Sequence, residues 1–180
     1  MNTIRLFTGT YADPEIFRFL YHELQKEFKH VAEGKWVEPE NLHFTYKFIG
    51  DFNVALINQL KSELSDALGD FDEEIEFRGI SCFPERGTPR VLHIGVHDRS
   101  GVLGEIFRKI ESVASHHNVP REKHPYSPHL TLMRIKSVKM PLLEEKLLEF
   151  KNKSFGSMKG FRVSLIESKL YSTGPIYRII

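Results

Sequence analysis

Two histidine–threonine pairs stand out because each places an imidazole two residues before a hydroxyl. The first is His43-Phe44-Thr45 and the second is His129-Leu130-Thr131. Each pair lies in a segment of alternating apolar and polar residues, which is typical of a β-strand, and side chains two apart in a strand share a face. Each segment therefore presents an imidazole beside a hydroxyl, while Phe44 and Leu130 point the opposite way.

These side chains suit proton transfer around a phosphoryl group. Imidazole titrates near neutrality, with an unperturbed pKa of about 6.5. One neutral histidine can therefore take a proton from an attacking water while a protonated one gives a proton to the leaving oxygen. The hydroxyls of Thr45 and Thr131 can donate hydrogen bonds to non-bridging phosphate oxygens. A single such motif is usually structural, but two at matching points of a repeated pattern are far more specific.

The elements that must position the motifs occur twice in the same order. In the first half the pattern predicts strands and helices over residues 3–10, 13–28, 42–49, 56–68 and 75–81. In the second half it predicts them over residues 91–97, 100–110, 129–135, 141–150 and 161–168, with an edge strand at 176–180. His43 and His129 are 86 residues apart, as are Phe77 and Val163. We therefore predict an α+β fold of duplicated β-α-β-α-β units whose antiparallel sheets flank a central cleft.

The composition indicates one folded domain. The 180 residues are 41% apolar, enough for a sizeable core, and the net charge of +1 argues against a general polyanion binder. The single cysteine, Cys82, excludes an internal disulfide and suits a reducing cytoplasm. No apolar run reaches the roughly 18 residues of a membrane span, and the N-terminus lacks a signal peptide. We expect a monomeric, cytoplasmic, bilobal domain over 1–180, with approximate lobes 1–85 and 86–180.

On these motifs the chain resembles the 2H phosphoesterase superfamily, and within it the RNA 2′,3′-cyclic phosphodiesterases once called 2′-5′ RNA ligases. The resemblance covers nearly the whole chain. Besides the two motifs, it rests on Ile4-Arg5-Leu6-Phe7, Trp36, Asn41-Leu42, Phe83-Pro84, Arg90-Val91-Leu92, Ser127-Pro128 and Gly174-Pro175 with Tyr177. Two features depart from the family pattern: His93 stands where relatives often carry Trp, and Thr8-Gly9 interrupts the opening strand.

The resemblance implies hydrolysis of 2′,3′-cyclic phosphate ends of RNA or nucleotides to 2′-phosphates, without a metal or other cofactor. It makes His43 the acid that protonates the departing 3′ oxygen and His129 the base that activates water. It also makes Arg134 a phosphate ligand, although strict alternation turns Arg134 away from His129, so the strand must bend or end. Candidates for base stacking, with core packing as the alternative, are Phe48, Phe83, Tyr126 and Tyr177.

Two other functions stay open. Hydrolysis run in reverse on aligned RNA ends gives a 2′-5′ ligase, and residue types do not separate that activity, or a 2′-5′ phosphodiesterase, from hydrolysis of cyclic ends. A non-catalytic RNA-binding module is the third interpretation, and the intact histidine and threonine of both motifs argue against it. A zinc site at His93 and His97 is not expected, because no Cys, Asp or Glu completes a ligand set.

Overall fold

The computed structural model describes residues 2–172 and 174–180. The elements of this part of the chain run in the order β1 (Thr3–Tyr11), α1 (Pro14–Phe28), β2 (Ala32–Trp36), η1 (Pro39–Asn41), β3 (His43–Asn53), η2 (Val54–Leu56), α2 (Ile57–Glu63), β4 (Gly69–Phe83), β5 (Val91–Asp98), α3 (Val102–His116), β6 (His129–Val138), α4 (Met140–Phe150), β7 (Ser154–Tyr171) and β8 (Gly174–Ile179). Within the described ranges, no helix is both long enough and apolar enough to cross a membrane.

Every predicted helix and strand is present, but several boundaries differ. Helix α1 begins as expected: the Asp13 carboxylate accepts from the Glu15 backbone N–H at 2.9 Å, and Pro14 follows the cap. Helix α3 begins one residue later than a cap at Ser100 predicts: its cap is Gly101, which adopts a left-handed φ of 79°. Strands β4 and β7 each begin six or more residues before their predicted starts, and β2 was not predicted.

One antiparallel sheet replaces the predicted pair of sheets. Its strand order is β1-β3-β6-β5-β4-β7-β8, with β2 paired to β6, and a further pairing of β1 with β7 closes six of the strands into a barrel-like ring. Strand β7 causes the closure because its first part pairs with β4 and its second part with β1. The α+β class and the antiparallel pairing are confirmed, and the prediction of separate sheets is wrong because all the described strands belong to one sheet.

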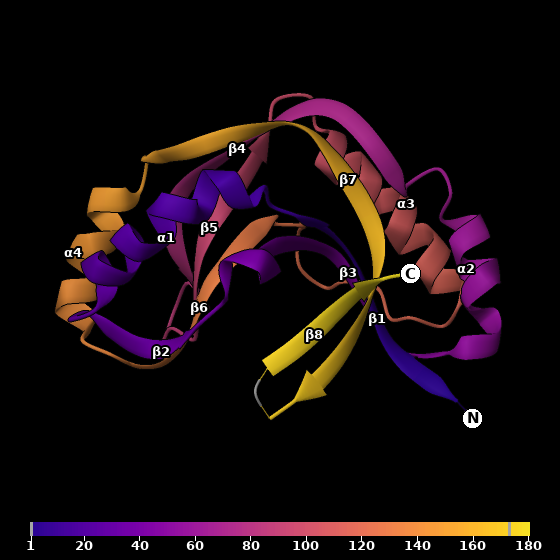
Figure 1. Ribbon diagram of the computed structural model, residues 1–180, viewed down its shortest axis with the longest axis horizontal. Helices are drawn as coiled ribbons and strands as arrows, with labels where there is room; N and C mark the ends of the chain where they lie inside the picture. Colours follow the sequence, from indigo (N-terminus) through magenta and orange to yellow (C-terminus); the bar gives the residue numbers. More distant parts are fainter. Residues whose placement is uncertain (1, 173) are drawn as a thin grey trace.

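The duplicated order of elements is visible in the sheet. Apart from the extra strand β2 in the first half, each half supplies strand, helix, strand, helix and strand in turn, with β1, β3 and β4 matched by β5, β6 and β7. In Figure 1, however, the helices group across the halves: α1 lies beside α4, and α2 lies beside α3. The Phe28 and Phe150 rings meet at 5.7 Å between α1 and α4. The division into lobes 1–85 and 86–180 stays a prediction. Each pair of neighbouring helices contains one helix from each predicted lobe.

The buried core leaves one face of the central strands free for polar side chains. Phe44 of β3, Leu130 of β6 and both Leu92 and Ile94 of β5 are fully buried in one hydrophobic cluster. Their neighbours along each strand point to the other face, because strand side chains alternate. The two motif histidines lie on that opposite face.

Candidate active site

A single pair of residues joins β3 to β6 and thereby brings the two motifs together. Phe44 and Leu130, the middle residues of the motifs, are antiparallel partners in the sheet. If this register is extended by one residue each way, His43 lies across from Thr131 and Thr45 lies across from His129. Phe44 and Leu130 point into the core, so all four motif side chains share the opposite face. The predicted convergence of the two motifs is therefore present in the strand register.

Both histidines are held in the same tautomer by the backbone. Nδ1 of His43 lies 2.6 Å from the Asn41 carbonyl oxygen, and Nδ1 of His129 lies 2.8 Å from the Ser127 carbonyl oxygen. A carbonyl can only accept, so each Nδ1 donates, and each Nε2 is left to exchange protons with a substrate. The two acceptors are 86 residues apart, like the histidines themselves.

Burial lowers the pKa of both motif histidines. For His43 the Asn41 carbonyl opposes this effect, while the positive charges of Arg134 and His129 lower the pKa further. For His129 the Ser127 carbonyl is the opposing influence. The neutral form of each ring is therefore favoured before an anion binds, and a bound phosphate would favour the protonated form.

Matching aromatic contacts surround the two imidazoles. His43 meets Tyr177 of β8 at 5.0 Å with an interplanar angle of 75°, and Phe7 of β1 at 5.1 Å. His129 meets Phe83 of β4 at 4.8 Å with an angle of 75°, and His93 of β5 at 5.1 Å. Phe7 and His93 are again 86 residues apart. The duplication therefore reproduces the walls of the site as well as the motifs.

His93 breaks this symmetry because it places an imidazole where the first half has Phe7. Its ring is 6% exposed and stacks on Phe83 at 4.1 Å. The Ile94 backbone approaches the ring, yet neither ring nitrogen has a hydrogen-bond partner among the described residues. Burial, followed by the charge of His129, lowers the pKa of His93 to about 4. His93 is therefore neutral near pH 7.

A β-bulge turns Arg134 toward the site. Leu92 pairs with Met133 and His93 pairs with Thr131, so Leu132 is an extra residue in β6. Both Leu132 and Met133 are consequently buried, and Arg134 emerges on the face of His129 and Thr131. This is the bend that the sequence required for Arg134 to reach the site.

The first half carries the same bulge at the equivalent place. Thr8 pairs with Lys47 and Gly9 with Thr45, so Tyr46 is the extra residue of β3. The bulge puts Phe48 on the motif face, where it is 62% exposed. The positive charge of Arg134 acts to lower the pKa of both His43 and Tyr177.

The four candidates for base stacking fall into two groups. Tyr177 and Phe83 contact the two motif histidines directly, and Phe48 lies 5.9 Å from Phe7 beside them. Tyr126 is placed differently, because Phe107 stacks on it at 4.5 Å and Tyr46 at 6.0 Å. Those two rings cover Tyr126 in the packing between α3 and β3, which is the core-packing alternative.

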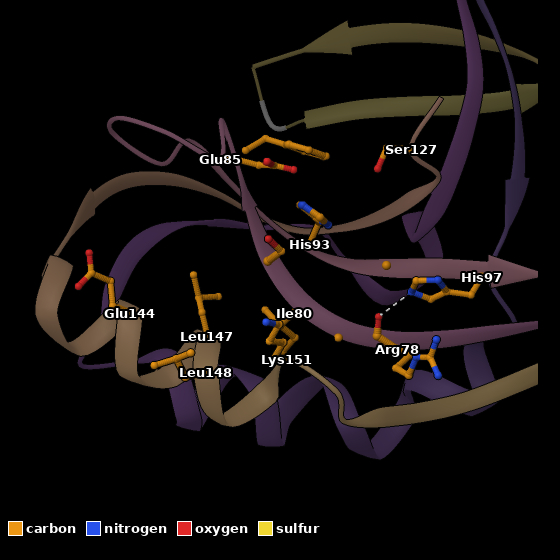
Figure 2. A pocket seen from close by; sticks show the side chains of 14 residues that line it. Arg78, Ile80, Glu85, His93, His97, Ser127, Glu144, Leu147, Leu148 and Lys151 are labelled. Carbon is orange, nitrogen blue, oxygen red and sulfur yellow. Dashed lines mark hydrogen bonds between the residues drawn. The ribbon is translucent and has the colours of Figure 1, made fainter. Parts of the chain in front are cut away.

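A groove continues from the His129 side of the site. It encloses about 670 Å³ and runs past His93 and Ser127 toward α4. Figure 2 shows His93 above the strands, with Leu148 of α4 and Lys151, which follows that helix, on the opposite wall. His97 Nε2 donates to the Arg78 carbonyl at 3.2 Å across the floor. The sequence did not predict this groove, because its two walls are far apart in the chain.

Metal ligands were not expected here. Among residues 2–172 and 174–180, no group of three or more His, Cys, Asp or Glu side chains is arranged to hold a metal ion. Whether the reaction needs a metal stays a prediction to be tested by chelation.

Known proteins are similar to this chain in sequence and in fold. The family model described as "LigT like Phosphoesterase" matches residues 20–93 and 94–177. The RNA 2′,3′-cyclic phosphodiesterase of Aquifex aeolicus is 31% identical over 100% of this chain and 96% of its own length. The protein of that name from Archaeoglobus fulgidus is 32% identical over 97% of each chain.

Solved structures confirm the fold. E. coli LigT complexed with 3′-AMP has a TM-score of 0.78 at 20% identity, covering 99% of this chain and 96% of that one. A Thermus thermophilus protein has a TM-score of 0.72 at 21% identity, covering 98% and 95%. Two successive matches to one family model agree with the duplicated elements and paired motifs. The chain belongs to the LigT-like phosphoesterase family.

Proposed function

We propose that the chain is a metal-independent RNA 2′,3′-cyclic phosphodiesterase that leaves 2′-phosphates. The observation that supports this most is the register of Phe44 with Leu130, which gathers both histidines and both threonines on one face. Acid–base hydrolysis of a phosphodiester uses one general base and one general acid, and a neutral and a protonated imidazole can supply the two. Relatives that match this chain over nearly its full length carry the same activity in their names.

In the proposed reaction His129 acts as the base and His43 as the acid. His129 Nε2 accepts a proton from water, whose oxygen forms a bond to phosphorus. The bond from phosphorus to the 3′ oxygen breaks, and His43 Nε2 supplies the proton that this oxygen takes. Attack and departure lie roughly in line at phosphorus, so the two rings act from opposite sides. Each Nδ1 keeps its bond to a backbone carbonyl throughout.

The phosphate itself makes this assignment workable. Arg134 lowers the pKa of His43, which disfavours the protonated acid in the free protein. A phosphodiester anion bound to Arg134 would offset that charge and favour protonated His43. Thr45 and Thr131 would donate hydrogen bonds to the non-bridging oxygens. Phe48, Phe83 and Tyr177 are the proposed contacts for the nucleoside, since their rings lie around the histidines.

A substrate with a much better leaving group tests the order of acid and base. Such a substrate needs little proton donation, so it should restore turnover to His43→Ala far more than to His129→Ala. The opposite pattern of rescue would reverse the two roles.

A 2′-5′ ligase activity is the alternative function, because it uses the same proton transfers in reverse. A monomer and a cytoplasmic location remain expectations.

The function is tested with a panel of RNAs and nucleotides ending in 2′,3′-cyclic phosphate, incubated with the protein in excess EDTA. We expect turnover to a 2′-phosphate that survives chelation. The position of the phosphate in each product is determined by mass spectrometry and by digestion with a 3′-specific phosphatase. No turnover of any cyclic end would overturn the proposal. Loss of turnover in EDTA, with recovery on adding one particular ion, would overturn its metal independence.

A further inference from the structure

The connection from α3 to β6 leads directly into His129 but contains no regular secondary structure. It covers residues 117–128 and ends with Ser127, whose carbonyl holds His129. The matching connection of the first half, residues 29–42, contains β2 and a short 3-10 helix. Strand β2 pairs along β6, so a ladder of backbone hydrogen bonds fixes the approach to His43. The approach to His129 must be fixed by other means.

A buried lysine contacts that irregular connection. Lys47 of β3 is 2% exposed. Its Nζ donates to the Pro120 carbonyl at 2.6 Å and lies 3.2 Å from a Glu122 carboxylate oxygen. It also lies 2.9 Å from a carboxylate oxygen of Glu111 in α3. The Glu122 backbone N–H donates to Glu111 in turn. Lys47 therefore joins β3, α3 and the connection at one point.

The other half of the molecule has no such lysine. The residue 86 positions after Lys47 is Met133, which is fully buried and apolar. Met133 pairs with Trp36 of β2. The connection of residues 29–42 is held by the pairing of β2 with β6, and there the chain carries the apolar Met133. The connection of residues 117–128 contains no strand, and there the chain carries the buried ammonium group of Lys47. A buried charge is costly unless it is fully paired, so its retention at one of two equivalent positions requires a reason.

We propose that Lys47 is a positioning residue for His129, and this inference rests on the proposed function. By fixing residues 120 and 122, Lys47 sets the path of the chain to Ser127 and hence the place of the carbonyl that orients the imidazole. Tyr126, stacked on Phe107, secures the intervening stretch. An anchor of this kind controls the geometry of proton transfer without contacting the substrate.

The first test compares Lys47→Met with Lys146→Met. Lys146 also pairs with two carboxylates, Glu27 and Glu149, but it links α1 to α4 away from the connection. For Lys47→Met we expect kcat on a cyclic-ended RNA to fall by about 10²-fold with little change in KM, since small misplacements of reacting groups have effects of this size. Lys146→Met should keep the wild-type kcat.

Lys47→Met leaves the Glu111 carboxylate buried and unpaired, so this variant can fail to fold. The double variant Lys47→Met/Glu111→Met removes both buried charges, and such apolar replacements are often neutral for stability. Its melting curve establishes folding, and its kcat then tests the anchor. A folded double variant with wild-type kcat would overturn the inference.

A second readout needs no turnover. In the wild type we expect the ¹⁵N spectrum of the His129 ring to show one tautomer, with the proton on Nδ1. In the double variant we expect a mixture of tautomers at His129, while His43 is unchanged. A wild-type His129 spectrum in that variant would contradict the inference even if the proposed function is correct. Absence of wild-type turnover would instead count against the proposed function, and the spectrum would still decide the role of Lys47.

Discussion

At the scale of single residues, the two motif histidines differ chiefly in the charges near them. The charge of Arg134 lowers the pKa of His43, and no comparable cation influences His129. Substituting this arginine should therefore separate the two titrations. In Arg134→Gln we expect the pKa of His43 to rise, because removing a nearby positive charge favours protonation, while that of His129 changes less. NMR titration of the ring protons measures both values.

Arg134→Lys is the matched control, since it keeps the charge and should leave the pKa of His43 near its wild-type value. Equal shifts at both histidines in Arg134→Gln, or none at His43, would show that the charge of Arg134 does not act selectively on His43.

The threonines are expected to act on the phosphate. Thr45→Val and Thr131→Val keep the shape of the side chain and remove the donor hydroxyl. We expect each to lower kcat/KM by roughly 10-fold to 10³-fold, as for other donors to a developing negative charge. Thr3→Val, at the exposed start of β1, is the control and should retain full activity. Unchanged kcat/KM in both motif variants would make these threonines structural.

His93 should make stability depend on pH. In the unfolded chain a histidine binds a proton below its ordinary pKa of 6.5, whereas folded His93 does so only near pH 4. The unfolded state therefore holds more protons between these values, and the free energy of unfolding falls as pH drops from 6.5 to about 4. The size of the loss is on the order of 3 kcal/mol.

His93→Phe removes this dependence and copies Phe7 of the other half. We expect the variant to be at least as stable at pH 7 and to lose less stability on acidification, as measured by urea unfolding at several pH values. An acid loss equal to that of the wild type would place the pKa of His93 near its ordinary value.

The motif residues could be predicted from the sequence because residue type and spacing alone define their chemistry. Each motif spans only three residues and ends before the bulge of its strand, so simple alternation holds within it. Alternation alone therefore places the histidine and threonine of each motif on one face: His43 with Thr45, and His129 with Thr131. The environment of His93 could not be predicted, since its burial depends on Phe83 from another strand. Tyr126 was a base-stacking candidate by residue type, and only the structure shows that the rings of Phe107 and Tyr46 stack on it.

At the scale of elements, the bulges at Tyr46 and Leu132 are the features that strict alternation misses. Each adds one residue to a strand, so two successive side chains are buried and every later one changes face. From the sequence alone, strict alternation turns Arg134 away from His129. We could therefore predict only that β6 must bend or end if Arg134 reaches the site. Strand β2 was missed for a different reason: its alternation is weak, and its pairing with β6 determines its conformation.

Two glycine substitutions test the role of β2. A Cβ at Gly34 would overlap the Arg134 carbonyl of the paired strand, which no side-chain rotation can relieve. Gly34→Ala should therefore separate β2 from β6, lower the free energy of unfolding by ~1–3 kcal/mol, and weaken activity by displacing Arg134. Denaturant midpoints and hydrogen exchange of the β2 amides measure the effect.

Gly104→Ala is the same substitution at the third residue of α3, where the new Cβ meets only the end of the Arg108 side chain. It should raise stability by about 0.5–1 kcal/mol, because glycine disfavours a helix interior. A Gly34→Ala protein as stable as the wild type would mean that β2 does not pair with β6 as described.

At the scale of the whole molecule, the offset of 86 residues predicted from His43 and His129 extends to the whole fold. It relates the acceptor carbonyls of Asn41 and Ser127 and the walls at Phe7 and His93. The closed ring was not predictable, because it depends on β7 pairing with both β4 and β1, and a repeat pattern does not determine which strands pair across the halves. Duplication therefore accounts for the two similar imidazoles, and their different neighbours account for different roles.

The central claim is that His43 and His129 act together as the acid and base of phosphodiester hydrolysis. The most direct test is kcat on a cyclic-ended RNA for His43→Ala, His129→Ala and the double variant, each shown by its melting curve to be folded. We expect each single variant to lose roughly 10²-fold or more, and the double variant to lose much less than the product of the two, because the residues act as a unit. Near wild-type kcat in either folded single variant would contradict the account.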